Sequence, residues 1–161
     1  MQTFLPYSDY NLCAEALDSK RLNKQILECY QILNVLSGQS PTGAWRNHPA
    51  VLMWSGAESH LYNYTMAMVK EADKRGIKTD KNLANLKALQ AKCKKSWGYN
   101  TPAWYKPDNL RYVNITHRAN LYRKDPIAYA NFSGYTTSQY NQPCCDRCQY
   151  FWPTHKEKNG R

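Results

Sequence analysis

The sequence has few acidic residues, no long apolar run and none of the common catalytic motifs. It contains 12 Asp and Glu against 22 Lys and Arg, which gives a formal net charge of +10. Such scarcity of carboxylates disfavours a two-metal nuclease site, which needs several of them around magnesium. No apolar stretch approaches the ~18 residues of a membrane span, and the first ten residues lack the layout of a signal peptide. We therefore expect a cytoplasmic protein with no membrane contact.

Motif searches exclude several enzyme classes. There is no phosphate-binding glycine loop, no His-Glu-X-X-His run, no deaminase Cys/His/Glu set and no nucleophile elbow. The charge instead indicates an anionic partner, and nucleic acid is favoured because its binding releases counterions. An acidic protein partner, or no specific partner, remains an alternative. The chemistry left open is metal-free and uses an amine with one carboxylate.

Residues 18–36 have the pattern of a helix with two different faces. Asp18 and Ser19 can cap its start, and Gly38 can end it. Apolar residues at steps of three and four predict a stripe that faces the core, formed by Leu22, Ile26, Cys29, Leu33 and Leu36. The polar face groups Arg21, Lys24, Glu28 and Gln31. This face is either a solvated surface with a Lys24–Glu28 pair, or a lone acid among phosphate-binding cations.

The remaining periodic segments also favour helices. They cover residues 8–17, 48–75, 80–95 and 108–125. The second of these is expected to be one long helix, opened by His48-Pro49 and closed by Gly76. No alternating strand pattern exceeds a few residues, so we expect an all-α fold. It would form a single compact helical domain over residues 1–128, with an irregular, aromatic and cysteine-containing tail over residues 129–161.

Aromatic and basic residues alternate in the second half of the chain. The loop 96–107 is dense in Trp and Tyr, and the helix after it presents Arg111, His117, Arg118, Arg123 and Lys124. Aromatic rings can stack on bases while cations neutralise phosphates, which is typical of nucleic-acid binding. As an alternative, His117 and Arg118 are ordinary solubilising groups.

Six cysteines in a chain without a secretion signal favour reduced thiols. Cys13, Cys29 and Cys93 lie within helical patterns and are expected in the core. A separate cluster holds Cys144, Cys145 and Cys148, with His155 nearby. This cluster could bind a structural zinc ion, form a strained disulfide or keep free thiols. No other cofactor is expected.

A nucleophilic amine must be unprotonated, and this requirement favours the chain terminus. An α-amino group has a reference pKa of about 7.7 to 8.0, against about 10.4 for lysine. Gln2 is bulky, so we expect the initiator Met1 to be retained. The predicted nucleophile is therefore the amine of Met1.

Three runs of the sequence resemble the phage-type pyrimidine-dimer DNA glycosylases, the endonuclease V family. They are Leu22-Asn23-Lys24-Gln25-Ile26-Leu27-Glu28, Trp45-Arg46-Asn47-His48-Pro49 and Glu71-Ala72-Asp73-Lys74-Arg75-Gly76. The resemblance is nearer to a branch that begins Met-Gln-Thr-Phe-Leu-Pro-Tyr, and it covers Met1 to about Pro126.

This resemblance implies an all-α, metal-free, monomeric enzyme that acts on double-stranded DNA. Its terminal amine would attack the deoxyribose anomeric carbon, displace the base and form an imine, after which β-elimination nicks the strand. Glu28 matches the family's catalytic glutamate, which stabilises positive charge on the sugar and assists proton transfer. The candidate DNA-binding residues are Arg21, Lys24, Gln25, Arg46, Asn47, His48, His117, Arg118 and Lys124.

The chain also departs from the family pattern. A retained Met1 would crowd the nucleophile, the aromatic tail has a different spacing, Asn120 replaces an arginine, and the cysteine cluster is new. These differences leave the lesion open. The alternatives are a non-catalytic basic DNA-binding protein of the same fold, or a glycosylase or lyase for another damaged or modified base.

Overall fold

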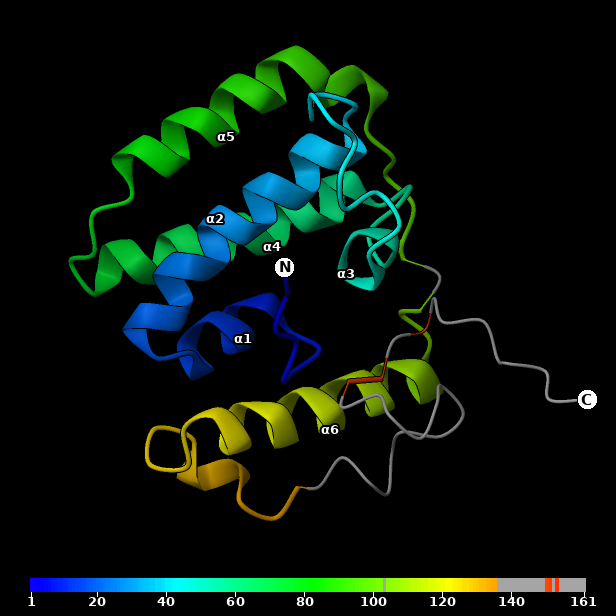
Figure 1. The fold of residues 1–161 in the computed structure, drawn as a ribbon. Coiled ribbons are helices and arrows are strands. Elements are labelled where there is room, and N and C mark those ends of the chain that lie inside the picture. The colour runs from blue at the N-terminus through cyan, green and yellow to red at the C-terminus, as the bar shows by residue number, and fades with distance from the viewer. Residues whose placement is uncertain (103, 136–149, 152, 154–161) are drawn as a thin grey trace, which may run out of the picture. The chain divides into compact units, whose positions relative to one another are not determined.

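The computed structural model describes residues 1–102, 104–135, 150, 151 and 153. These residues form helices, turns and irregular segments without a β-strand, so the predicted all-α class is confirmed (Figure 1). No helix among them is both long and apolar enough to cross a lipid bilayer. The chain divides into two units, of which the first contains Met1–Thr3 and Asp9–Pro102 and the second contains Phe4–Ser8 and Ala103–Arg161.

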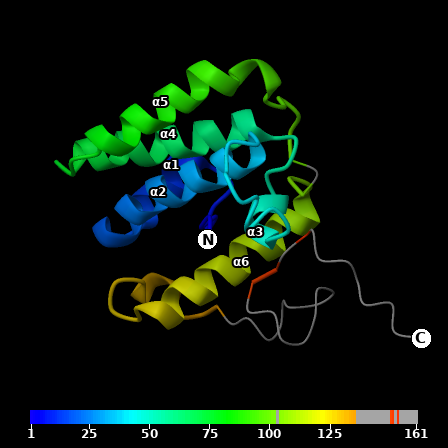
Figure 2. The same cartoon turned by 45° about the horizontal axis from the view of Figure 1, so that its top comes forward.

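The first unit is a bundle of α-helices. Its helices are α1 (Tyr10–Ala16), α2 (Ser19–Leu36), α3 (Pro49–Leu52), α4 (Glu58–Lys74) and α5 (Asp80–Cys93), followed by the 3-10 turn η1 (Lys94–Ser96). Helix α2 packs against α4 and α5, and α4 packs against α1, as Figures 1 and 2 show. The core consists of fully buried apolar side chains, including Leu22, Ile26, Leu33, Leu61, Met68 and Leu86. Burial of this apolar surface is the main stabilising contribution.

Helix α2 begins and ends as its sequence predicts. The Asp18 side chain accepts a 3.1 Å hydrogen bond from the Arg21 amide, which is a standard N-cap. At the other end, the Ser37 amide donates to the Leu33 carbonyl, and Gly38 has a φ of 68°. Glycine adopts this left-handed conformation without a steric penalty. The two ends therefore fix which residues of α2 lie on its apolar face and which lie on its polar face.

The single helix expected over residues 48–75 is wrong, because the structure divides it into α3 and α4. Gly56 has a φ of 77°, which interrupts the helix between them. The Glu58 carboxylate stabilises the break, accepting hydrogen bonds from the amide of Gly56 at 3.0 Å and of Gly98 at 2.7 Å. Any side chain on Gly98 would overlap the Gly56 carbonyl. This long-range contact, absent from the local pattern, decides where α4 begins.

The end of α4 is joined to the end of α1 by Arg75. Its guanidinium donates to the carbonyls of Leu17 at 2.6 Å and Glu15 at 3.1 Å, and it pairs with Glu71 at 2.8 Å. These carbonyls lie at the C-terminal end of α1, where backbone acceptors lack partners within the helix. Arg75 therefore caps α1 from another helix.

The second unit is built on α6 (Pro107–Lys124), with the 3-10 turn η2 (Ala130–Phe132) packed against it. The extended segment Phe4–Ser8 is bonded to α6. The Leu5 amide donates to His117 Nδ1 at 2.8 Å, and Arg118 Nε donates to the Pro6 carbonyl at 2.6 Å. The second unit thus holds its part of the N-terminal chain through side chains of one helix.

Candidate active site

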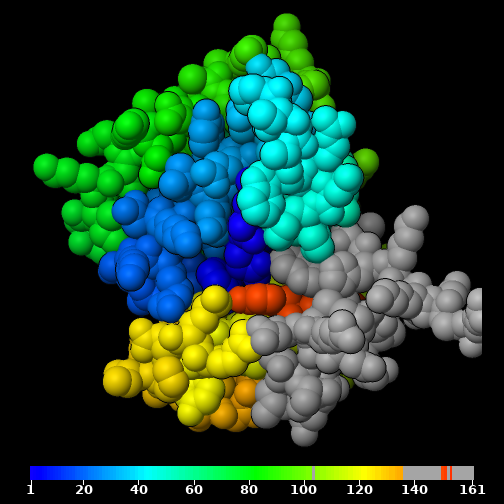
Figure 3. Space-filling view, viewed as in Figure 1, coloured from blue at the N-terminus to red at the C-terminus, as the bar shows by residue number. Residues whose placement is uncertain are grey.

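The N-terminal strap, residues Met1–Thr3, is bonded to α2 next to the predicted catalytic acid. The Gln2 amide donates a 3.1 Å hydrogen bond to Glu28 Oε2, and Gln25 Nε2 donates a 2.5 Å bond to the Gln2 carbonyl. The Thr3 hydroxyl accepts a 3.0 Å bond from the indole of buried Trp54. Figure 3 shows the start of the chain, in dark blue, at the surface beside α2 in blue. The strap is therefore held at two successive residues.

This arrangement limits the distance between the terminal amine and the Glu28 carboxylate. Three covalent bonds separate the Met1 nitrogen from the Gln2 nitrogen, so the two atoms lie within about 3.7 Å of each other. With the 3.1 Å bond from Gln2 to Glu28, the amine lies within about 7 Å of the carboxylate. That separation is suitable for an amine and an acid that act on one sugar.

Glu28 has a second partner in Lys24. Lys24 Nζ lies 3.5 Å from Glu28 Oε1, and the Lys24 side chain is 70% exposed against 14% for Glu28. An ion pair with so exposed a lysine contributes little stability. The carboxylate is thus mostly covered and fixed by the Gln2 amide, while the lysine extends into solvent.

His48 lies at the start of α3 and within electrostatic range of the chain terminus. Its Nδ1 accepts a 3.1 Å hydrogen bond from the Ala50 amide, so the ring caps the helix. Burial lowers the pKa of His48 below its usual 6.5, and the positive charge of the chain terminus lowers this pKa further. His48 is therefore neutral near pH 7 and lies within electrostatic range of the amine.

The loop before α3 places two further candidates at the surface. Arg46 and Asn47 are both exposed. Arg46 Nε donates a 3.1 Å bond to the Gly43 carbonyl, and its guanidinium lies over Gly43, where a side chain would collide with it. Trp45 was not among the site residues predicted from the sequence, although it is 56% exposed and its ring centre lies 5.4 Å from that of His48. Its place in the run Trp45-Arg46-Asn47-His48-Pro49 was the available signal.

Gln25 was expected to contact DNA, and the structure corrects this. Its side chain is 1% exposed, and its amide oxygen accepts a 3.3 Å bond from the Tyr64 hydroxyl while its nitrogen holds Gln2. Helical spacing explains the burial, since Gln25 lies three residues after Leu22 and four before Cys29 on the core stripe. Gln25 therefore positions the N-terminal strap.

Arg21 occupies the same polar face of α2 as Lys24 and Glu28. Its guanidinium pairs with Asp18 at 2.8 Å, and its side chain is 24% exposed. The first unit thus brings together Met1, Glu28, Lys24, Arg21 and His48 from the strap, α2 and the start of α3.

The other candidates lie on α6 in the second unit, and one of them is corrected. His117 is fully buried rather than exposed, because it lies on the same helix face as Val113 and Leu121. Burial lowers the pKa of His117 to about 3, so the ring is neutral and accepts the Leu5 amide. His117 is therefore part of the core and does not contact DNA.

Arg118 and Lys124 differ in how much of them solvent can reach. The Arg118 guanidinium donates to the Tyr135 hydroxyl at 2.7 Å and lies 4.7 Å from the ring centre of Tyr7. Through these contacts Arg118 joins Tyr7 and Tyr135 to α6 within the second unit. Lys124 is exposed at the end of α6 and remains a candidate phosphate ligand.

The cysteines separate into two groups. Cys13, Cys29 and Cys93 are buried reduced thiols, as predicted. Burial raises the pKa of the Cys29 thiol to about 12, so this group is protonated and unreactive near the strap. The cluster of Cys144, Cys145, Cys148 and His155 lies outside the described residues. Within the part of the chain that is described, no three His, Cys, Asp or Glu residues gather as a metal site.

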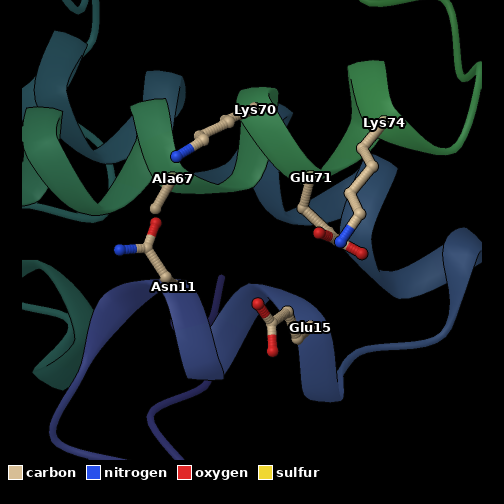
Figure 4. A pocket seen from close by; sticks show the side chains of 6 residues that line it. All are labelled: Asn11, Glu15, Ala67, Lys70, Glu71 and Lys74. Carbon is tan, nitrogen blue, oxygen red and sulfur yellow. The ribbon is translucent and has the colours of Figure 1, made fainter.

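A separate hollow of about 310 Å³ lies between α1 and α4 (Figure 4). Its charged lining mixes both signs, with Lys70 and Lys74 opposed by Glu15 and Glu71. Glu71 is already paired with Arg75. The hollow contains none of the predicted site residues.

Comparison with known proteins identifies the family. A family model described as pyrimidine dimer DNA glycosylase matches residues 1–85, which is more than half of the chain and includes the strap, Glu28 and His48. No curated protein and no solved structure gives a significant match. With this match over the N-terminal strap and its acid, the chain belongs to the pyrimidine dimer DNA glycosylase family, a family of DNA-repair enzymes whose substrate is DNA.

Proposed function

We propose that this glycosylase excises pyrimidine dimers from double-stranded DNA as a monomer and then cleaves the strand at the abasic site. The observation that supports the proposal is the hydrogen bond between the Gln2 amide and Glu28. It holds the first residues of the chain beside a mostly buried carboxylate. An amine and an acid at this separation are suited to imine chemistry on one deoxyribose.

The α-amine of Met1 is the proposed nucleophile. An α-amino group in general has a reference pKa about 2.5 units below that of a lysine, so α-amines as a class are unprotonated to a larger extent near neutral pH. Lys24, whose Nζ lies 3.5 Å from Glu28, has a side chain that is 70% exposed to solvent. Neutral His48, close to the terminus, can accept the proton that the amine loses on attack.

In the first step the amine nitrogen forms a bond to C1′ of the damaged nucleotide. The bond from C1′ to the base breaks, its electron pair leaves with the base, and the base takes up a proton. The Glu28 carboxylate stabilises the positive charge that develops on the sugar. Glu28 then takes up a proton from water and gives it to O4′ as the C1′–O4′ bond opens and the nitrogen lone pair forms the protonated imine.

Strand cleavage follows from the imine. The protonated imine acidifies the C2′ hydrogen, and its removal expels the 3′ phosphate as the C3′–O bond breaks. Water then hydrolyses the imine and frees the amine for another turnover. The enzyme therefore acts as both a DNA glycosylase and an abasic-site lyase.

Basic and polar residues of the first unit would hold the strand around this centre. Arg21 and Lys24 lie on the polar face of α2 beside Glu28, and Arg46 and Asn47 are exposed on the loop that leads to His48. Phosphate contacts of this kind fix the position of DNA without reading its sequence. Lys124, which is exposed on the second unit, is a separate candidate phosphate ligand.

Borohydride trapping on a duplex with one abasic site tests the mechanism. We expect a covalent adduct whose peptide map identifies Met1, and no adduct after selective acetylation of the α-amine. An adduct on a lysine would refute the terminal nucleophile. Absence of any adduct from the folded, DNA-bound protein would refute the enzyme and support the non-catalytic alternative.

Duplexes that each contain one defined lesion test the substrate. We expect the pyrimidine dimer to be excised faster than undamaged thymines and faster than other modified bases. If another modified base is released and the dimer is not, the choice of lesion is refuted while the lyase mechanism stands.

A further inference from the structure

Trp45 is an exposed aromatic residue in a loop that otherwise consists of small and polar residues. Its side chain is 56% exposed, whereas the other tryptophans that the structure describes, Trp54, Trp97 and Trp104, are at most 4% exposed. An exposed indole is costly in water, because it leaves a large apolar surface solvated. The exposed face of the indole is available for another flat ring to pack on.

The backbone of Trp45 is also strained. Its φ is 71°, and among the described residues it is the one non-glycine residue with a positive φ. A bulky side chain rarely adopts this conformation, and such strain gathers at functional sites. The conformation is held by the hydrogen bond from the His48 amide to the Trp45 carbonyl at 2.9 Å. The loop thus keeps a strained backbone conformation at the residue whose indole is exposed to solvent.

The indole lies next to the candidate active site. Its ring centre is 5.4 Å from that of His48, with an angle of 66° between the rings. An edge contact of this kind fixes one edge of the indole and leaves the exposed part of its face for another ring. His48 in turn lies within electrostatic range of the chain terminus. Exposed Arg46 and Asn47 follow directly and can hold the phosphates of the same nucleotide.

We propose that Trp45 stacks on a nucleobase left exposed when the reacting nucleotide rotates out of the DNA helix. The inference rests on the proposed function, because it assumes that the sugar reacts at the strap. An enzyme that extrudes a nucleotide loses base stacking, and an aromatic side chain can replace part of it. An indole offers a flat surface that accepts any base, so it would hold the opened DNA without selecting its sequence.

A binding measurement without chemistry tests the stacking directly. The probe is a duplex that contains a tetrahydrofuran abasic analogue, which cannot form an imine, with 2-aminopurine beside it. We compare the wild type with Trp45→Gly, Trp45→Phe and the control Tyr99→Ala, which removes another exposed ring of the same unit. Glycine tolerates the positive φ, so Trp45→Gly removes the indole without adding backbone strain.

Stacking quenches 2-aminopurine, so we expect lower emission with the wild type, Trp45→Phe and Tyr99→Ala than with Trp45→Gly. Equal emission with the wild type and Trp45→Gly at saturating protein would refute the proposal, and would indicate that Trp45 meets another partner or none. The proposal would also be refuted if Tyr99→Ala weakened the quenching of 2-aminopurine as much as Trp45→Gly does.

Single-turnover kinetics then separate base stacking from amine chemistry. Trp45→Gly should lower dimer excision on the order of tenfold, because a stacked aromatic ring contributes that much or more per base. At a preformed abasic site, where the reacting nucleotide has no base pair to break, the same variant should lower trapping by a smaller factor, and Trp45→Phe should restore most of the excision. Equal losses on both substrates would refute the inference, because Trp45 would then support the amine.

The two proposals fail in different ways. If the wild type forms no borohydride adduct, the imine mechanism is refuted. The emission test on the tetrahydrofuran duplex then still decides whether Trp45 stacks, because it requires binding alone.

Discussion

The side-chain amide of Gln25 holds the backbone carbonyl of Gln2 at 2.5 Å, across 23 positions of the sequence. On the same helix, the Glu28 carboxylate accepts a hydrogen bond from the backbone amide of Gln2. Two side chains one turn apart on α2 therefore bind the backbone amide and the backbone carbonyl of Gln2. Gln2 is fixed in position and in orientation, and with it the amine that precedes it.

Replacing Gln25 with Leu should disturb this placement. Loss of the buried amide leaves the Gln2 carbonyl and the Tyr64 hydroxyl without that partner, and should cost about 1 to 3 kcal/mol of stability. We expect single-turnover strand cleavage to fall at least tenfold, with DNA affinity measured by fluorescence anisotropy nearly unchanged. Gln31→Leu, an exposed change on the same helix, is the control. Unchanged cleavage in Gln25→Leu would show that the strap does not depend on this bond.

Replacing Glu28 with Gln should separate binding from chemistry. The amide oxygen can still accept the Gln2 amide, so the strap stays in place while the negative charge is lost. Removal of a charge-stabilising and proton-transferring group should lower single-turnover cleavage by about 100-fold or more. Dissociation constants for the lesion duplex should change less than threefold. A parallel loss of affinity and cleavage would indicate a structural role for Glu28.

Buried His117 should make the protein sensitive to acid. Burial lowers the pKa of His117 from 6.5 to about 3 in the folded state, so between these values the unfolded state binds the extra proton. The contribution of His117 to the free energy of unfolding should therefore be fully present above pH 6.5. It should fall as the pH drops toward 3, by up to about 1.4 kcal/mol per pH unit. Urea unfolding at pH 7.0, 5.5 and 4.5 measures the slope.

The matched variant for this measurement is His117→Gln, which keeps an acceptor for the Leu5 amide but does not titrate. It should be less stable than the wild type at pH 7 and should show a flatter dependence on pH. An equal slope in both proteins would assign the acid sensitivity to other groups.

Binding to undamaged duplex should depend steeply on salt. If five or more phosphates are neutralised, a plot of log K against log salt should have a slope of about −4.5 or steeper. Lys24→Gln should make this slope shallower by about 0.9, whereas Lys87→Gln on the outer side of α5 should not change it. Filter binding between 50 and 200 mM salt gives the slopes. A flat plot would contradict a basic DNA-binding face.

Local sequence signals predicted those features that depend on neighbouring residues. The bounds of α2 followed from Asp18 and Ser19, from Gly38 and from the spacing of its apolar residues, all within one segment. The break between α3 and α4 did not, because it depends on the bond between Glu58 and Gly98, which are 40 positions apart. A local pattern has no access to such a contact.

The burial of two polar residues could have been inferred. Gln25 and His117 each lie three or four residues from apolar positions on the core face of their helices, and polarity outweighed position in the prediction. The strained backbone of Trp45 is different. No property of tryptophan predicts a positive φ, since the turn that imposes it depends on how the loop ends are held.

Those loop ends are held by a chain of contacts that begins far from the reaction. Glu58 fixes Gly98, and the neighbouring Trp97 donates a 2.8 Å hydrogen bond to the Ser37 hydroxyl, where the loop to His48 starts. A mutation at Glu58 would therefore loosen the loop without touching DNA. In a mutational screen the Glu58 variant would resemble a catalytic mutant, although its defect is a displaced loop. A stability assay run in parallel would tell the two apart.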